Sequence, residues 1–232
     1  MILAINTSTL QFGLALMEED ETVLAEFSAS RGKGHFGSLT PVLHFLLATT
    51  KSEIHAVKAI VVAIGPGSFT GLRVGLSLAK GLCHALEVPI IGISSLEAMA
   101  AQVPYPAPSI TPILDSRKEE FFAAQFVWRN DHDLIRNMED MCLRLEEFPN
   151  VFREPTLFIG NDFPRQAPLI MEVFGQHVLS ALPHAWNLKA SALGHLGLKR
   201  LRSNDFDNAE NLNPTYLRPP PIRPNPYPLI SE

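Results

Sequence analysis

The chain has 232 residues, of which 46% are hydrophobic and 19% are charged, and its formal net charge is −5. This length allows one large domain or two small ones, and the composition is typical of a globular protein. The acidic balance argues against a self-sufficient nucleic-acid binder. No apolar run reaches the length of a membrane span, and Cys83 and Cys142 have no paired spacing. We therefore expect a cytoplasmic protein without disulfides.

Strands and helices alternate over the first hundred residues. Apolar periodicity predicts strands over 1–5, 12–17, 22–28, 59–64 and 89–93, and helices over 36–49, 70–86 and 96–102. Pro41 can enter the first turn of the first helix, and Ser94 with Glu97 is typical of a capping box at the start of the third. The resulting order βββαβαβα is complete by about residue 103.

The second half is less regular. A proline-rich stretch, 104–108, is predicted to be a linker. Beyond it we expect strands over 110–114, 121–128 and 156–159, and helices over 165–174 and 188–201. Phe122, Ala124, Phe126 and Trp128 share one strand face and should be core. Because seven of the last nineteen residues are proline, 218–232 is expected to be an extended tail. The expected divisions are 1–103, 104–217 and 218–232.

The most informative motif is GPGSFTGLRVG, at 65–75. It follows a buried-type apolar run, so it indicates a strand, a tight turn and a helix capped by Ser68 or Thr70. Donor-rich turns of this kind cradle phosphates in many proteins. The Lys-Ser/Thr pair of a P-loop and the GxGxxG of a Rossmann turn are both missing here. A structural strand-to-helix turn is the favoured interpretation.

The helix that follows carries small residues on one face. Gly71, Gly75 and Ala79 recur every four residues, with Val74, Leu78 and Leu82 beside them. A glycine inside a helix costs about 1 kcal/mol relative to alanine, so another element must approach closely. That element is either this protein's own core or a helix of a second protein.

These segments resemble those of one family. ILAINTST at 2–9, GPGSFTGLRVG at 65–75, AKGL at 79–82, GISSLEA at 92–98 and YLR at 216–218 stand in the order and spacing of the TsaB (also called YeaZ) family. The resemblance is dense over residues 1–103 and thin afterwards. It implies an α/β protein with the actin-like ATPase fold (ASKHA, ribonuclease H-like). Two βββαβα-type lobes are implied, the second shortened, and its last helix could pack on the first lobe.

The resemblance also implies a function. TsaB proteins are non-catalytic scaffold or activating subunits in the synthesis of N6-threonylcarbamoyladenosine beside the tRNA anticodon. They form a heterodimer with TsaD through helices of the first lobe and work with TsaE, and tRNA binds only to the complex. A homodimer is expected when the chain is alone. The implied partner interface is Leu39, Val42, Leu43, Leu46, Gly71, Val74, Gly75, Leu78, Ala79 and Leu82.

Two departures bear on chemistry. Actin-like phosphotransferases hold hydrated magnesium with an aspartate where this chain has Asn6, a poorer ligand for a hard dication. TsaD carries a His-x-x-x-His metal pair, whereas here His35 is followed four residues later by Leu39. We therefore expect no catalytic residue, no metal and no tightly bound cofactor. ATP at the complex interface, near Asn6, Thr7 and Ser8, is a further expectation.

Two enzyme alternatives stay open. The first is a small actin-like ATPase or phosphotransferase that uses the turns at 6–8 and 65–71 for phosphate. Asn6 and the short second half argue against it. The second is a metallopeptidase of the M22 glycoprotease type, which the missing histidine pair disfavours.

Overall fold

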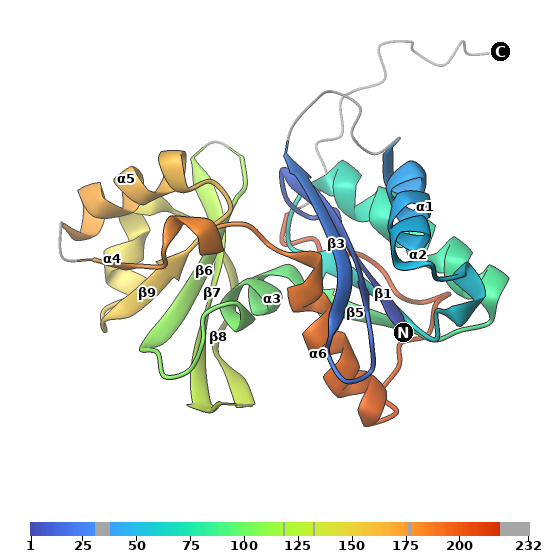
Figure 1. Cartoon of the computed structure of the whole chain (residues 1–232). Helices are drawn as coiled ribbons and strands as arrows, with labels where there is room; N and C mark the ends of the chain where they lie inside the picture. Colours follow the sequence, from blue (N-terminus) through green and yellow to red (C-terminus); the bar gives the residue numbers. More distant parts are fainter. Residues whose placement is uncertain (31–37, 118, 132, 176–177, 219–232) are drawn as a thin grey trace, which may run out of the picture.

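The structure, a computed structural model, describes residues 1–30, 38–117, 119–131, 133–175 and 178–218. They form two lobes, each built around a five-stranded mixed sheet (Figure 1). Among the described residues, no helix is long and apolar enough to span a bilayer.

The first sheet has the order β3-β2-β1-β4-β5. Its strands are β1 (Ile2–Asn6), β2 (Gln11–Met17), β3 (Val23–Ser30), β4 (Ile60–Gly65) and β5 (Ile90–Ser94). The first three form an antiparallel meander, and β1, β4 and β5 run parallel. Strands β1 and β4 are apolar on both faces because helices cover both sides of the sheet.

Helices lie on both faces of the first sheet (Figure 1). They are α1 (Leu39–Thr50), α2 (Phe69–Leu86), α3 (Ser95–Ala101) and α6 (Ala190–Arg202), with the short 3-10 helix η2 (Ile54–Ala56) after α1. Alternate strand residues separate the core into two layers. Leu3 and Ile5 pack with α1 and α2, whereas Ile2 and Ala4 pack with α3 and α6.

The second lobe repeats this topology in a shorter form. Its elements are β6 (Ser109–Asp115), β7 (Glu120–Asn130), β8 (Asp133–Arg144), η3 (Leu145–Glu147), α4 (Phe148–Val151), β9 (Thr156–Ile159), α5 (Phe163–Phe174), β10 (Leu179–Ser180) and η4 (Pro183–Ala185). Counted from β8, the order β8-β7-β6-β9-β10 is that of the first sheet. The four-residue α4 stands where the first lobe has the twelve-residue α1. The predicted fold, with a shortened second lobe, is confirmed.

Strand β7 carries the predicted core face. Phe122, Ala124, Phe126 and Trp128 all belong to one cluster, which also contains the α3 and α6 side chains. The intervening Phe121 packs on the other face with α4 and β9. The sequence analysis missed β8, because its many polar residues hide the period of two and its pairing with β7 is a tertiary contact.

The chain returns to the first lobe at its end. Helix α6 packs against the first sheet, as expected for the last helix. The segment after it, 203–218, runs back over the first sheet. The Asp207 N–H donates to the Ile90 carbonyl of β5, and the Thr215 N–H donates to the Ile64 carbonyl of β4 at 2.7 Å. We call residues 203–218 the strap. Of the expected tail, 219–232 lies outside the described residues. Arg218 belongs to the strap instead, because it pairs with Glu120 of the second lobe.

Candidate functional site

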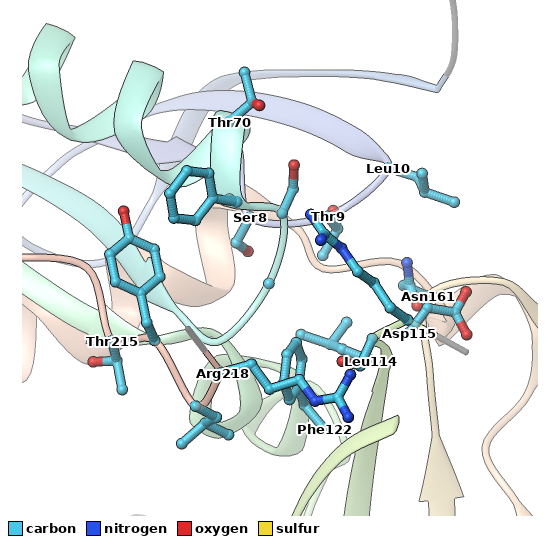
Figure 2. A pocket seen from close by; sticks show the side chains of 17 residues that line it. Ser8, Thr9, Leu10, Thr70, Leu114, Asp115, Phe122, Asn161, Thr215 and Arg218 are labelled. Atoms are coloured by element: carbon cyan, nitrogen blue, oxygen red, sulfur yellow. The ribbon is translucent and has the colours of Figure 1, made fainter. Parts of the chain in front are cut away.

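A cleft of about 610 Å³ separates the two lobes (Figure 2). The corresponding hairpin turns of both lobes contribute to it, β1–β2 from one side and β6–β7 from the other. The strap forms a further wall. The lining residues include Ser8, Thr9, Gly67, Ser68, Phe69, Thr70, Tyr216 and Arg218 of the sequence motifs, together with Asp115 and Arg117 of the β6–β7 turn. The repeated topology therefore brings two loops, more than a hundred residues apart in sequence, to one cavity.

The predicted nucleotide contacts Asn6, Thr7 and Ser8 are mostly internal. Asn6 and Thr7 have no exposed surface and do not line the cleft. The Asn6 amide donates to the Leu188 carbonyl at 2.8 Å, and its Oδ1 accepts from the backbone N–H and hydroxyl of Ser8. The Thr7 hydroxyl donates to the Gly71 carbonyl at 2.8 Å. Of the three, only Ser8 reaches the cleft.

Three of the four glycines of the 65–75 motif pack against the protein's own β1–β2 turn. A Cβ on Gly67 would lie 2.2 Å from the Ser8 carbonyl oxygen, and one on Gly71 would lie 1.9 Å from that of Thr7. A Cβ on Gly75 would lie 2.1 Å from Thr7 Oγ1. Of the two explanations for the small-residue face, close approach to the chain's own core is the one that the structure supports.

The sequence offered Ser68 and Thr70 as caps for α2, and the structure shows that Ser68 is the cap. Ser68 is the N-cap of α2, and its hydroxyl accepts from the Gly71 N–H at 3.2 Å. Thr70 lies within the helix and its side chain faces the cleft (Figure 2). The motif therefore fixes the turn that holds α2 against β1 and β2.

Most of the predicted partner interface is core. The sequence analysis treated these residues as available to a partner, but seven of them are buried inside the first lobe: Leu39, Val42, Leu43, Leu46, Gly71, Gly75 and Ala79. Val74, Leu78 and Leu82 are half-buried on α2. Phe45 of α1, which the prediction omitted, is 58% exposed. Phe45 lies outside the buried stripe of α1. A helical projection of 39–50 already places it outside that stripe, so the sequence held this signal.

An aromatic stack joins the strap to α2 at the cleft. The rings of Phe69 and Tyr216 lie 4.9 Å apart, and the Arg73 guanidinium lies 3.8 Å from the centre of the Phe69 ring. Arg73 Nε also donates to the Tyr216 hydroxyl at 3.1 Å. Because Arg218 then pairs with Glu120, the strap connects the two lobes across the cleft.

Charged side chains of the β6–β7 turn lie beside the cleft. Asp115 pairs with Arg165 of α5, and Arg117 lines the cleft. Lys118 lies outside the described residues. The other oxygen of Asp115 is buried and has no hydrogen-bond partner among the residues that the structure describes. The cleft therefore presents hydroxyls, one paired carboxylate and two arginines.

Metal ligands are not gathered anywhere in the part of the chain that the structure describes. There, no group of three or more His, Cys, Asp and Glu side chains is arranged to hold a metal ion. His35 lies outside the described residues. Leu39, four residues further on, is a buried core residue of α1.

Two lobes of the same sheet order around a cleft define the actin-like class of α/β proteins. YeaZ from Pseudomonas aeruginosa shares this fold, with a TM-score of 0.79 and 22% identity over 93% of this chain and 99% of that one. EutJ, an ethanolamine utilization protein from Carboxydothermus hydrogenoformans, aligns with a TM-score of 0.51 and 10% identity over 84% and 90% of the two chains.

Sequence comparison identifies the family within this class. The pattern of the family described as TsaD, tRNA N6-adenosine threonylcarbamoyltransferase, matches residues 22–219. The tRNA threonylcarbamoyladenosine biosynthesis protein TsaB of Bacillus subtilis is 34% identical over 94% of this chain and 93% of its own. The chain belongs to the TsaB (YeaZ) family.

Proposed function

We propose that this chain is a non-catalytic subunit of the machinery that forms N6-threonylcarbamoyladenosine in tRNA. It pairs with TsaD through α1 and α2, works with TsaE, and contacts tRNA only within that complex, in the cytoplasm. Membership of the TsaB family supports the pathway. The match to the TsaD family pattern supports a partner of similar fold.

The observation that carries the pairing is Phe45. A phenylalanine with 58% of its surface exposed is unusual in the middle of a helix whose other face is core. Val74, Leu78 and Leu82 of α2, on the same side of the first sheet, add half-buried apolar surface. In Figure 1 both helices lie on the side of the first lobe that faces away from the second lobe. Exposed and half-buried apolar side chains on two helices of the same lobe favour a protein interface there.

The hydrogen bonds of Asn6 support the proposal that the isolated chain is not catalytic. Its amide is fully engaged within the β1–β2 turn and with Leu188, so it is not available to a magnesium ion. ATP, if the complex uses it here, meets Ser8 and the α2 start in the cleft rather than Asn6 or Thr7. Without TsaD, the same surface around Phe45 forms a homodimer.

Co-purification with TsaD tests the pairing. We expect Phe45→Asp to weaken the complex by at least about tenfold, since a buried aromatic anchor is typically worth 2 kcal/mol or more. Leu182→Asp is the matched control, because Leu182 is 65% exposed but lies on the second lobe. Equal loss in both variants, or in neither, would contradict the assignment to α1 and α2.

The catalytic role is tested by omission. We expect threonylcarbamoyl transfer to tRNA only when TsaD, TsaE and this chain are all present, and no transfer by this chain alone. Magnesium-dependent ATP hydrolysis by the purified chain would favour the phosphotransferase alternative. A stoichiometric tightly bound metal ion in the purified chain would favour the metallopeptidase.

A further inference from the structure

A second cavity, of about 310 Å³, lies between the lobes further along β7 than the cleft. Phe122, near the start of β7, lines the cleft, whereas Trp128, near its end, lines this cavity. Its other walls come from α3, α6, β5 and the start of β8. The volume suits a small ligand, and neither the predicted interface nor the cleft includes it.

Glu97 of α3 places a carboxylate at this cavity. The sequence predicts a capping box, but only half of it forms: the Glu97 N–H donates to the Ser94 hydroxyl at 3.3 Å. The Glu97 carboxylate does not return to Ser94, and it accepts no hydrogen bond from any residue that the structure describes. It faces the cavity instead. Burial raises the pKa of Glu97, even though nearby cations act against the rise.

Those cations are committed to other carboxylates. Arg136 of β8 pairs with Asp140. Arg200 of α6 makes charge-assisted bonds to both Asp205 and Asp207, and Lys199 pairs with Asp133. The charged residues of the cavity wall itself are Glu97, Asp205, Lys199 and Arg200. Arg136, Asp133, Asp140 and Asp207 belong to the same ion-pair cluster but do not line the cavity. Two carboxylates and two cations therefore line the cavity, and Glu97 is the one of the four without a direct ion pair among the described residues.

Trp128 supplies the apolar part of the wall. Its indole N–H donates to the Val103 carbonyl at 2.8 Å, which fixes the ring at the cavity. Leu134 and Leu196 line the space beside it. A carboxylate beside a fixed indole and aliphatic side chains is the combination that recognises an organic cation, because the indole face attracts positive charge and the carboxylate neutralises it.

We propose that this cavity binds a small alkylammonium ion, with Glu97 as its counter-ion and Trp128 as its aromatic wall. The site is separate from the surface around Phe45, so the proposal does not depend on the pairing with TsaD. Inorganic cations are a poorer fit, because Glu97 is, among the described residues, the single unengaged carboxylate of the wall. The other charged wall residues, Lys199, Arg200 and Asp205, are already in ion pairs.

Titration of the full chain with 1,4-diaminobutane, followed by tryptophan fluorescence at constant ionic strength, tests this site. The chain has two tryptophans, and Trp186 is only 1% exposed, so a change in emission reports Trp128. We expect a saturable change with a Kd of about 1 mM or tighter. 1,4-Butanediol, which has the same length without charge, should cause none. A diol response equal to that of the diamine, or no saturation with the diamine, would overturn the proposal.

Variants separate binding from general effects. Glu97→Gln should weaken the diamine by about tenfold or more, since a charged contact is lost. Glu154→Gln, an exposed carboxylate of the second lobe, is the control and should bind as the wild type. Trp128→Phe should abolish the fluorescence change while calorimetry still detects weaker binding. Circular dichroism checks that each variant is folded. Unchanged affinity in Glu97→Gln would rule out this counter-ion.

Discussion

Thr7 and Gly71 are joined by a 2.8 Å hydrogen bond from the threonine hydroxyl to the glycine carbonyl oxygen. The two residues are 64 positions apart, and the contact locks the β1–β2 turn against the first turns of α2. The bond is buried, so the carbonyl is satisfied without water. The small-residue face of α2 therefore stabilises the first lobe from within.

The role of Gly75 can be measured directly. Gly75→Ala would place a Cβ 2.1 Å from Thr7 Oγ1, so the buried turn must shift. We expect a loss of about 1–3 kcal/mol in the free energy of unfolding, as for other overpacked cores. For a chain of this size, that lowers Tm by about 2–4 °C per kcal/mol. Denaturant unfolding gives the value.

Gly81→Ala provides the control in the same helix. A Cβ at Gly81 meets no atom within 4 Å, so alanine should raise stability by up to about 1 kcal/mol through its helix propensity. Opposite signs at the two positions are expected. Equal effects would mean that propensity, and not the contact with Thr7, determines the outcome at Gly75.

Asn6→Asp tests whether the β1–β2 turn tolerates the aspartate that actin-like phosphotransferases carry at this position. The Asn6 Nδ2 atom donates to the Leu188 carbonyl at 2.8 Å, and an aspartate oxygen there would face another acceptor in a buried position. We expect a loss of about 1–3 kcal/mol or more at pH 7. Thermal unfolding should show partial recovery at lower pH, where a protonated aspartic acid can donate. Wild-type stability at pH 7 would contradict the assigned donor.

The pH dependence of stability should contain a contribution from Glu97. Burial raises the pKa of this carboxyl in the folded protein, above its unfolded value of about 4.3. The ionised form therefore costs stability at neutral pH, and the cost falls as the pH drops through the folded pKa. Glu97→Gln has no such cost. Its stability advantage over wild type should be largest near pH 7 and shrink toward pH 4.5, as denaturant unfolding can measure. An advantage that grows on acidification would contradict the sign.

The strap is tested by truncation. A chain that ends at Arg218 keeps all the described contacts and should unfold as the full chain does. A chain that ends at Asn213 loses the Thr215 bond to Ile64 and the Tyr216 ring on Phe69. It should be destabilised by about 2 kcal/mol. An intermediate chain that ends at Leu217 loses only the ion pair of Arg218 with Glu120, which is worth about 1 kcal/mol or less.

Local patterns predicted the elements better than their contacts. The apolar run before Gly65 and the Ser68 cap depend on neighbours in sequence, and both are found as predicted. The spacing of Gly71 and Gly75 indicates close approach but cannot identify Thr7 as the neighbour, because that contact is made by the fold. Strand β8 was missed for the same reason: its conformation depends on pairing with β7, which is also a contact made by the fold.

Sequence patterns also could not separate interface residues from core residues. Apolar residues at helical spacing in α1 define a stripe, and the lobe's own sheet buries that stripe. Phe45 lies outside the stripe, so the residue that breaks the pattern is more informative about a partner than those that follow it. At Glu97 the capping motif gave the right backbone contact, and the fold turned the carboxylate toward a cavity.

The return of α6 and the strap to the first sheet has a consequence for synthesis of the chain. Residues 109–186 form the second lobe as one continuous insertion, whereas the first lobe needs β1–β5 and also α6. A ribosome therefore releases all of the second lobe before it releases the helix that covers one face of the first sheet. Domains fold as units during translation. The second lobe can fold early, and the first lobe is completed only when its last helix has emerged.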